Sequence, residues 1–173
     1  MKLGKDFFER PAYEVAPLLV GKVLCRQKGG EILRARITET ECYYGFDDSA
    51  SHAHKGKTDR NAVMFGEGGR TYIYLCYGIH NLLNITTGYE GHPEAVLICG
   101  TERAQGPGRV TKAFSIDREQ NKLSVFGEDA LIWIEDDGYI PKIVTGKRVG
   151  IDYAKEKDRE RPWRFLDADL AKL

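Results

Sequence analysis

Three consecutive pieces of sequence decide the fold: Gly21-Lys-Val-Leu-Cys-Arg26, the pair Gly29-Gly30, and the long run from Glu31 to Tyr44. Two strand-like runs joined by a short glycine-containing turn are typical of a β-hairpin. We therefore expect residues 21–44 to form a hairpin, with residues 31–44 as its second strand.

The second strand of this hairpin carries charged and aromatic side chains at alternate positions. Side chains two residues apart in a strand point to the same face. The residues expected to share one face are Ile37, Glu39, Glu41 and Tyr43. This spacing puts the two carboxylates ~7 Å apart. Such a pair is usually the solvated edge of a strand, but a carboxylate beside aromatic faces also suits gripping a flat base while water cleaves it from its sugar.

A second hairpin is predicted from Thr71 to Tyr77 and from Ile79 to Thr86, turning around Tyr77-Gly78. Tyr72 and Tyr74 would share a face of its first strand. Tyr77 falls at the tip, where an aromatic side chain is poorly placed for a core and well placed to act as a wedge.

Residues 45–70, between the hairpins, are rich in Gly, Asp, Ser, Lys and His and predict a loop. A loop of this length in a compact domain is usually functional or disordered. It contributes an imidazole, His52, and positive charge at Lys55 and Lys57.

The flanking segments predict shorter elements. Pro11 suits the first turn of an N-terminal helix and Gly21 a position just past its end. Pro17 predicts a break or kink, because proline lacks the backbone donor and crowds the preceding turn. The other expected elements are a buried strand over 95–99, a turn over 106–109, a helix opening over 110–114 and a strand over 131–135.

Composition favours one folded domain over residues 1–173. Hydrophobic residues make up 42% and charged residues 30% of the chain, which argues against disorder. No apolar run approaches the ~20 residues that cross a bilayer, and the first ten residues lack the apolar stretch of a secretory signal. The four cysteines are widely spaced, so we expect small buried thiols in a reducing compartment rather than a zinc site or a disulfide frame.

The charge is balanced in total and uneven along the chain. The 26 basic and 26 acidic side chains cancel, which taken alone lowers the expectation of nucleic-acid binding. Residues 139–164, however, carry eight Lys or Arg against four Asp or Glu. A neutral total can therefore conceal a basic face, and we expect phosphate contacts from four cations: Arg109, Lys147, Arg148 and Arg164.

Nine short motifs occur in an order that identifies a family. They are Thr40-Glu-Cys-Tyr43, His52, Arg60-Asn61, Met64-Phe65, Tyr72-Ile-Tyr74, Tyr77-Gly78, Asn84-Ile85, Gly106-Pro-Gly108 and Arg148-Val-Gly150. Each alone is weak, but in this order and spacing the chain resembles the alkyladenine (3-methyladenine) DNA glycosylase family over nearly its whole length. The resemblance implies a mixed α/β (α+β) fold, one domain around a curved, mostly antiparallel sheet with flanking helices.

The resemblance also implies a role for each site residue. Glu41 matches the catalytic residue that orients and deprotonates the attacking water. Tyr77 matches the side chain that enters the duplex where the base was, and Asn84 the position that crowds the 2-amino edge of guanine. The residues that match the walls of the purine pocket are Tyr43, His52 and Tyr74. Glu39 is expected to be structural.

The chain departs from the family pattern at Cys99, where the family often carries arginine. The partner implied is double-stranded DNA with damaged purines, bound by a monomer without a metal or other cofactor. The expected location is the cytoplasm, with the nucleoid, in a bacterium or the nucleus in a eukaryote.

Two other functions fit parts of the pattern. A hydrolase of free nucleosides could use Glu39 and Glu41 as a pair, and would need neither a wedge nor a basic face. A binding module could stack single-stranded DNA or RNA on the tyrosines without any chemistry. Neither explains the full ordered set of motifs.

Overall fold

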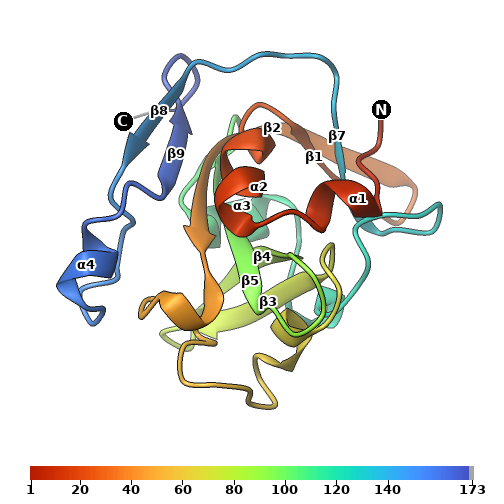
Figure 1. The fold of residues 1–173 in the computed structure, drawn as a ribbon. Coiled ribbons are helices and arrows are strands. Elements are labelled where there is room, and N and C mark those ends of the chain that lie inside the picture. The colour runs from red at the N-terminus through yellow and green to blue at the C-terminus, as the bar shows by residue number, and fades with distance from the viewer. Residues whose placement is uncertain (172–173) are drawn as a thin grey trace.

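The two predicted hairpins meet in one curled antiparallel sheet, seen in the computed structural model, which describes residues 1–171 (Figure 1). The first hairpin is β1 (Val23–Lys28) with β2 (Glu31–Tyr43), and the second is β3 (Thr71–Cys76) with β4 (His80–Thr87). β5 (Glu94–Thr101) pairs with both β4 and β2 and so joins the hairpins. The predicted α+β fold around a curved antiparallel sheet is confirmed.

Four short strands extend this sheet. β7 (Ile132–Glu135) pairs with β1, and β6 (Ala104–Gln105) with β5. β9 (Arg164–Asp167) pairs with the second half of β2, and β8 (Ile143–Gly146) with β9. β8 and β9, with the short helix α4, lie on one side of the molecule, and β1 and β7 on the other (Figure 1). The sequence did not predict β6, β8 or β9.

The helices are few and short. They are α1 (Lys5–Phe8), α2 (Ala12–Leu19), α3 (Pro107–Ala113), α4 (Glu156–Arg159) and the 3-10 turns Gly45–Asp47, Ala62–Phe65 and Arg118–Gln120. Helix α3 begins three residues before the predicted start, because Pro107 occupies the first helical position, where its missing N–H has no intrahelical partner to lose.

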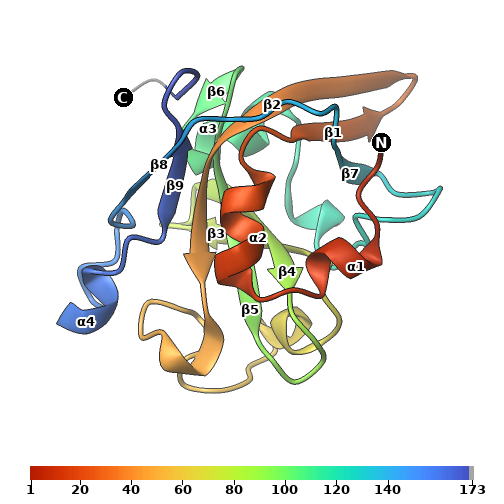
Figure 2. The same cartoon turned by 45° about the horizontal axis from the view of Figure 1, so that its top comes forward.

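Helix α2 lies across the sheet (Figure 2) and runs unbroken through Pro17, so the predicted break is wrong. Proline at this position removes one backbone hydrogen bond of the helix, a loss that packing against the sheet offsets. Val15 and Leu19 hold the helix by packing into the core. The Glu94 carboxylate accepts a hydrogen bond from the N–H of Ala12 (2.9 Å) and so caps its first turn.

Alternation along the strands separates the core face of the sheet from a second face, which borders a cavity. Leu83 and Ile85 of β4 and Val96 and Ile98 of β5 pack with α2 and α3 in the main hydrophobic cluster. Each fully buried aliphatic side chain of this kind contributes about 1.5–3 kcal/mol. The residues between them on the same strands face the opposite way and line a cavity.

A bulge in β2 changes which residues share this second face. The pairing of β2 with β5 shifts register between Ile37 and Glu39 and again between Glu39 and Thr40. An extra residue in one strand reverses the alternation on either side of it. Ile37 therefore packs in the core, while Glu39 and Glu41 line the cavity, so the prediction that Ile37 shares their face is wrong.

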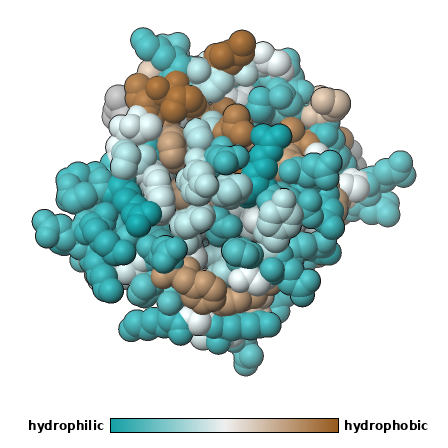
Figure 3. Space-filling model, viewed as in Figure 1, coloured by the Kyte–Doolittle hydropathy of each residue, from teal (hydrophilic) through white to brown (hydrophobic). Residues whose placement is uncertain are grey.

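The outer surface is predominantly polar. Figure 3 shows hydrophilic residues over most of the visible face, with hydrophobic residues in small separate groups. In residues 1–171, every helix is too short or too polar to cross a lipid bilayer.

Candidate active site

A cavity of about 770 Å³ opens on the second face of the sheet. Its walls come from strands β2 to β5, from the loop that contains His52, and from the segment 149–153 that precedes α4. All five residues predicted as catalytic or substrate-binding line it: Glu41, Tyr43, His52, Tyr74 and Asn84. The structure therefore brings together side chains that are up to 43 positions apart in the sequence (84 − 41).

Glu41 lies on the floor of the cavity and is almost completely buried, with 2% of its surface exposed. One carboxylate oxygen, Oε1, accepts a hydrogen bond from the Val149 N–H, and Oε2 accepts one from the Tyr43 hydroxyl, both at 2.8 Å. Burial raises the pKa of the Glu41 carboxyl, and these two donors partly oppose that rise. A raised pKa makes the ionised carboxylate a stronger base than an exposed glutamate.

Tyr43 remains a hydrogen-bond donor because its phenol stays protonated. Burial first, and then the neighbouring charge of Glu41, raise the pKa of Tyr43 well above the usual value. Its ring also lines the cavity, so one side chain both holds the carboxylate and forms part of the wall.

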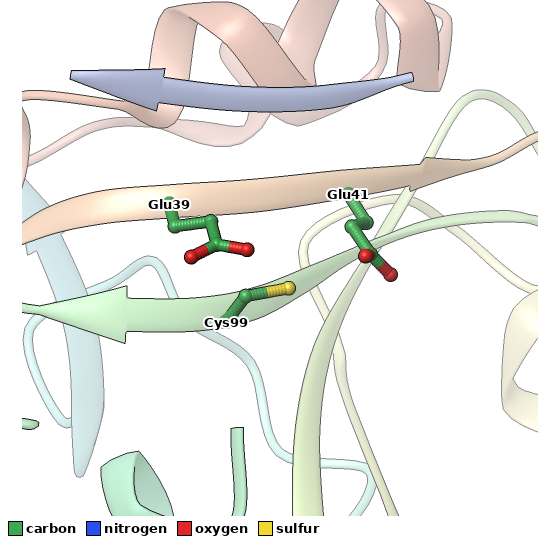
Figure 4. A group of neighbouring side chains, drawn as sticks. All are labelled: Glu39, Glu41 and Cys99. Atoms are coloured by element: carbon green, nitrogen blue, oxygen red, sulfur yellow. The ribbon is translucent and has the colours of Figure 1, made fainter. Parts of the chain in front are cut away.

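Glu39 and Cys99 lie beside Glu41, from β2 and from the adjacent strand β5 (Figure 4). One carboxylate oxygen of each glutamate and the Cys99 sulfur all lie within 4.8 Å of one another. Two carboxylates and a thiol are a possible ligand set for a divalent metal, but the Arg164 Nε already donates to Glu39 at 2.6 Å. Burial also raises the pKa of the Cys99 thiol well above the usual value, which disfavours the thiolate that a metal needs.

An aromatic wall faces the carboxylate. The His52 ring lies edge-on to Tyr74, with ring centroids 4.5 Å apart, and His52 Nδ1 is 2.9 Å from the Tyr72 hydroxyl. The Arg60 guanidinium lies 5.0 Å from the centre of the Tyr74 ring. The faces of these rings are slightly electron-rich, and a heteroaromatic ring can stack on a face of this kind.

Buried polar side chains position the loop that contains His52. The amide of Asn61 donates to the carbonyls of His52 and Gly56, both at 3.0 Å, and its oxygen accepts from the Thr58 N–H. At the start of the loop, the Asp48 carboxylate accepts from the backbone N–H of Tyr44. The long polar segment is thus an ordered part of the site.

His52 is expected to stay neutral at physiological pH. Its side chain is exposed to solvent, while its ring also contacts Tyr72 and Tyr74. Partial burial, assisted by the charge of Arg60, lowers its pKa to about 4. Since an unfolded histidine titrates near 6.5, the contribution of His52 to stability is complete above that pH and is lost as the pH falls towards 4. Titration of its ring protons by NMR should show no protonation between pH 8 and 5; a midpoint above 6 would contradict this placement.

Asn84 is held in a fixed orientation inside the cavity. It is 4% exposed, and its amide donates to the backbone carbonyl of Tyr72 at 3.1 Å. One polar group thus faces an otherwise mostly apolar wall formed by residues such as Leu82 and Leu97. A fixed polar group of this kind can discriminate between edges of a bound base.

Tyr77 projects from the tip of the β3–β4 hairpin at the mouth of the cavity, with 91% of its surface exposed. Its backbone has a φ of 52°, in the left-handed region that costs a non-glycine residue about 1–2 kcal/mol. A strained backbone and a large exposed aromatic ring are both unfavourable for stability alone, and strain of this kind is concentrated at functional sites.

Comparison with known proteins agrees with this geometry. The chain matches the family described as methylpurine-DNA glycosylase (MPG) over residues 6–105 and 99–171. It is 43% identical to a protein of Methanocella arvoryzae (95% of this chain, 92% of the relative) and 45% identical to one of Anaeromyxobacter dehalogenans (95% and 83%). Both carry the name "Putative 3-methyladenine DNA glycosylase". The chain belongs to the methylpurine-DNA glycosylase family.

The structure revises the role expected of Arg148 in this glycosylase. Its side chain is fully buried, and its two terminal nitrogens bond both oxygens of Asp48 (2.6 and 2.9 Å) and the carbonyls of Cys42 and Asp158. This guanidinium has no exposed side-chain surface and is held by Asp48 and two carbonyls, which does not favour the predicted contact with a DNA phosphate. Arg148 instead ties the segment that supplies the Val149 N–H to the end of β2.

The three other cations expected to bind phosphate lie in different environments. Arg109 is exposed on α3 and borders a second groove with Arg103 and Lys112. Lys147 is exposed and paired with Glu160 at 2.6 Å. Arg164 lines the base cavity and pairs with Glu39, so its position indicates a role near the carboxylates.

Several groups that line or support the candidate site were not predicted from the sequence. The N–H of Val149 is one, since a backbone donor more than 100 residues from Glu41 leaves no local signal. Tyr72, which bonds His52, and Arg60, which covers Tyr74, are the others. Both occur in the motifs that identify the family, which was the only signal that could have found them.

Proposed function

We propose that the protein is a monofunctional glycosylase that binds double-stranded DNA, flips out alkylated or deaminated purines and hydrolyses their N-glycosidic bond, leaving an abasic site. The observation that carries this proposal is the position of Glu41, a buried carboxylate on the floor of an aromatic-walled cavity. The carboxylate inside this cavity cannot reach the glycosidic bond of a base that is stacked in a duplex, so the nucleotide must leave the stack first.

The aromatic wall supports recognition of a flipped purine. Stacking a base on an aromatic side chain contributes about 1–3 kcal/mol. Purines that carry a positive charge after alkylation are attracted further by the electron-rich faces of Tyr43 and Tyr74. This gives a preference for damaged bases that does not depend on the neighbouring sequence.

Glu41 is proposed to perform the hydrolysis. As the glycosidic bond breaks, the base leaves with the bonding electrons, positive charge grows on the sugar, and the carboxylate stabilises it. Water adds to the anomeric carbon, and its proton passes to Glu41. An alkylated purine cation departs as a neutral base and needs no acid. A damaged purine without a charge needs a group that gives a proton or a hydrogen bond to its ring as it leaves.

The cavity lining supports hydrolysis without strand cleavage. No lysine is among the cavity-lining residues in the described part of the chain, and a Schiff base with the sugar requires an amine at this place. We also propose that the enzyme acts as a monomer, in the cytoplasm of a bacterium or the nucleus of a eukaryote.

Tyr77 is proposed to fill the gap that the flipped nucleotide leaves. Replacing Tyr77 by alanine should weaken binding to a lesion-containing duplex by about tenfold, since one stacked aromatic contributes ~1–3 kcal/mol. Fluorescence of 2-aminopurine next to the lesion would report the loss of the flipped state. The matched control is Tyr13→Ala, an exposed tyrosine on α2, and unchanged affinity in Tyr77→Ala would count against the wedge.

Base release from defined duplexes tests the proposed function directly. Duplexes with a single 3-methyladenine, hypoxanthine or ethenoadenine are incubated with the protein without added metal, and free base and abasic sites are measured. Release from at least one duplex, without strand nicking, is expected. Release from free nucleosides alone would favour the nucleoside hydrolase, and tight single-strand binding without release would favour the binding module.

A further inference from the structure

Strand β9 brings a positive charge to the floor of the cavity. In the pairing of β9 with β2, Arg164 lies directly opposite Glu41. Residues opposite each other in antiparallel strands are the nearest cross-strand neighbours, with Cβ atoms about 4.5–5.5 Å apart. Yet the guanidinium bonds the carboxylate two residues away, with Nε 2.6 Å from Glu39 Oε1.

A bond from Arg164 to Glu41 would impair the proposed chemistry in two ways. The two oxygens of Glu41 already accept one hydrogen bond each, from Val149 and Tyr43. A third, charge-assisted donor would occupy a lone pair needed for the proton of water. It would also stabilise the ionised carboxylate and so make it a weaker base.

We infer that Glu39 is a positioning residue, which holds Arg164 away from Glu41 and thereby leaves Glu41 free to activate water. This inference rests on the proposed function and adds to it a role for two further residues. Glu39 and Glu41 compete for one guanidinium, and in this structure it is bonded to Glu39, the more exposed of the two carboxylates (9% against 2% exposed).

The other polar groups around Glu41 do not offer the same alternative. They are the hydroxyls of Tyr43, Tyr74 and Tyr153, the Cys99 thiol and the Arg148 guanidinium. The phenols and the thiol have no charge at neutral pH, and Arg148 is held by both oxygens of Asp48. Arg60, another cation that lines the cavity, lies over the Tyr74 ring. Arg164, directly opposite Glu41 in the strand pairing, is therefore the cation best placed to move onto Glu41 when its partner is removed.

Three variants separate this role from simple loss of a salt bridge: Glu39→Gln, Arg164→Gln and the double variant. Glu39→Gln removes a repelling charge and releases Arg164 towards Glu41. The acid limb of the pH profile of the single-turnover excision rate should therefore move to lower pH. The maximum rate should fall about tenfold, which is within the range of coupling energies between neighbouring charges. Arg164→Gln leaves Glu39 uncompensated beside Glu41, so the acid limb should move to higher pH. The double variant should recover to within about threefold of the unmodified protein.

The rescue and the opposite shifts decide the outcome. A double variant no faster than Glu39→Gln, or two single variants whose acid limbs do not move in opposite directions, would overturn the inference. Arg34→Gln, which removes another pair from β2 (to Glu135, 3.6 Å), is the control for strand stability and should leave the pH profile unchanged. If Glu39→Gln does not fold, Glu39→Asp takes its place: the shorter carboxylate should loosen its hold on Arg164, and a maximum rate equal to that of the unmodified protein would overturn the inference.

A second readout keeps the inference separate from the proposed function. Titration of the Glu41 carboxyl carbon by NMR, without substrate, should give a lower pKa in Glu39→Gln and a higher one in Arg164→Gln. If the unmodified protein releases no base from any duplex, the proposed function fails, while the two titrations still report how Glu39 and Arg164 act on the Glu41 carboxyl. If base is released and the titrations do not shift, only the role of Glu39 is lost.

Discussion

Replacing Glu41 by glutamine is expected to lower the rate of base excision at least about 100-fold, the low end of the contribution of a general base. Affinity for lesion-containing duplex should stay nearly unchanged, because the amide preserves the shape of the cavity floor. The amide oxygen can still accept from the Val149 N–H, and the amide nitrogen can donate to the Tyr43 oxygen. Single-turnover excision and equilibrium binding to the same duplex separate the two effects.

The matched control for this variant is Glu31→Gln, which changes an exposed glutamate at the far end of the same strand. It should excise at the normal rate. Near-normal excision by Glu41→Gln would remove Glu41 from the chemistry and, with it, the water-activation mechanism. Loss of both excision and binding would instead indicate that the charge is needed to shape the cavity.

The sequence predicted most of the site because local periodicity determines where strand side chains point. Tyr72 and Tyr74 lie two residues apart on one strand and so share a face, and Tyr77 follows at the turn. Glu39 and Glu41 likewise share a face of another strand. Strong β-patterns joined by glycine turns place such residues without any long-range information. The exposure of Tyr77 at the hairpin tip follows from the same local rule.

The sequence failed where pairing between distant strands decided the outcome. The bulge that turns Ile37 into the core arises from the pairing of β2 with β5, and no residue pattern near Ile37 in the sequence signals it. Pro17 remains helical because tertiary packing of α2 outweighs its propensity. The neighbours of Arg148 lie 106, 100 and 10 residues away, so a residue that looked like a surface cation is an interior one.

The buried pair of Arg148 and Asp48 leads to the second large expected effect. Replacing Arg148 by methionine should destabilise the protein by about 3–5 kcal/mol, because it leaves the Asp48 charge buried without its partner. The change also removes the contact of the guanidinium with the faces of Tyr43 and Trp163, 5.0 and 5.2 Å from the ring centres. A fall in Tm of about 10 °C is expected in thermal unfolding for a chain of this size.

Two further variants show whether the effect comes from the unpaired charge. Lys147→Met removes the adjacent cation, whose pair with Glu160 is exposed, and should change stability by less than about 1 kcal/mol. Adding Asp48→Asn to Arg148→Met should recover part of the loss, because the uncompensated charge is then gone. If Arg148→Met instead keeps its Tm and loses affinity for DNA, with a weaker dependence of binding on salt, then Arg148 contacts phosphate and does not stabilise the interior.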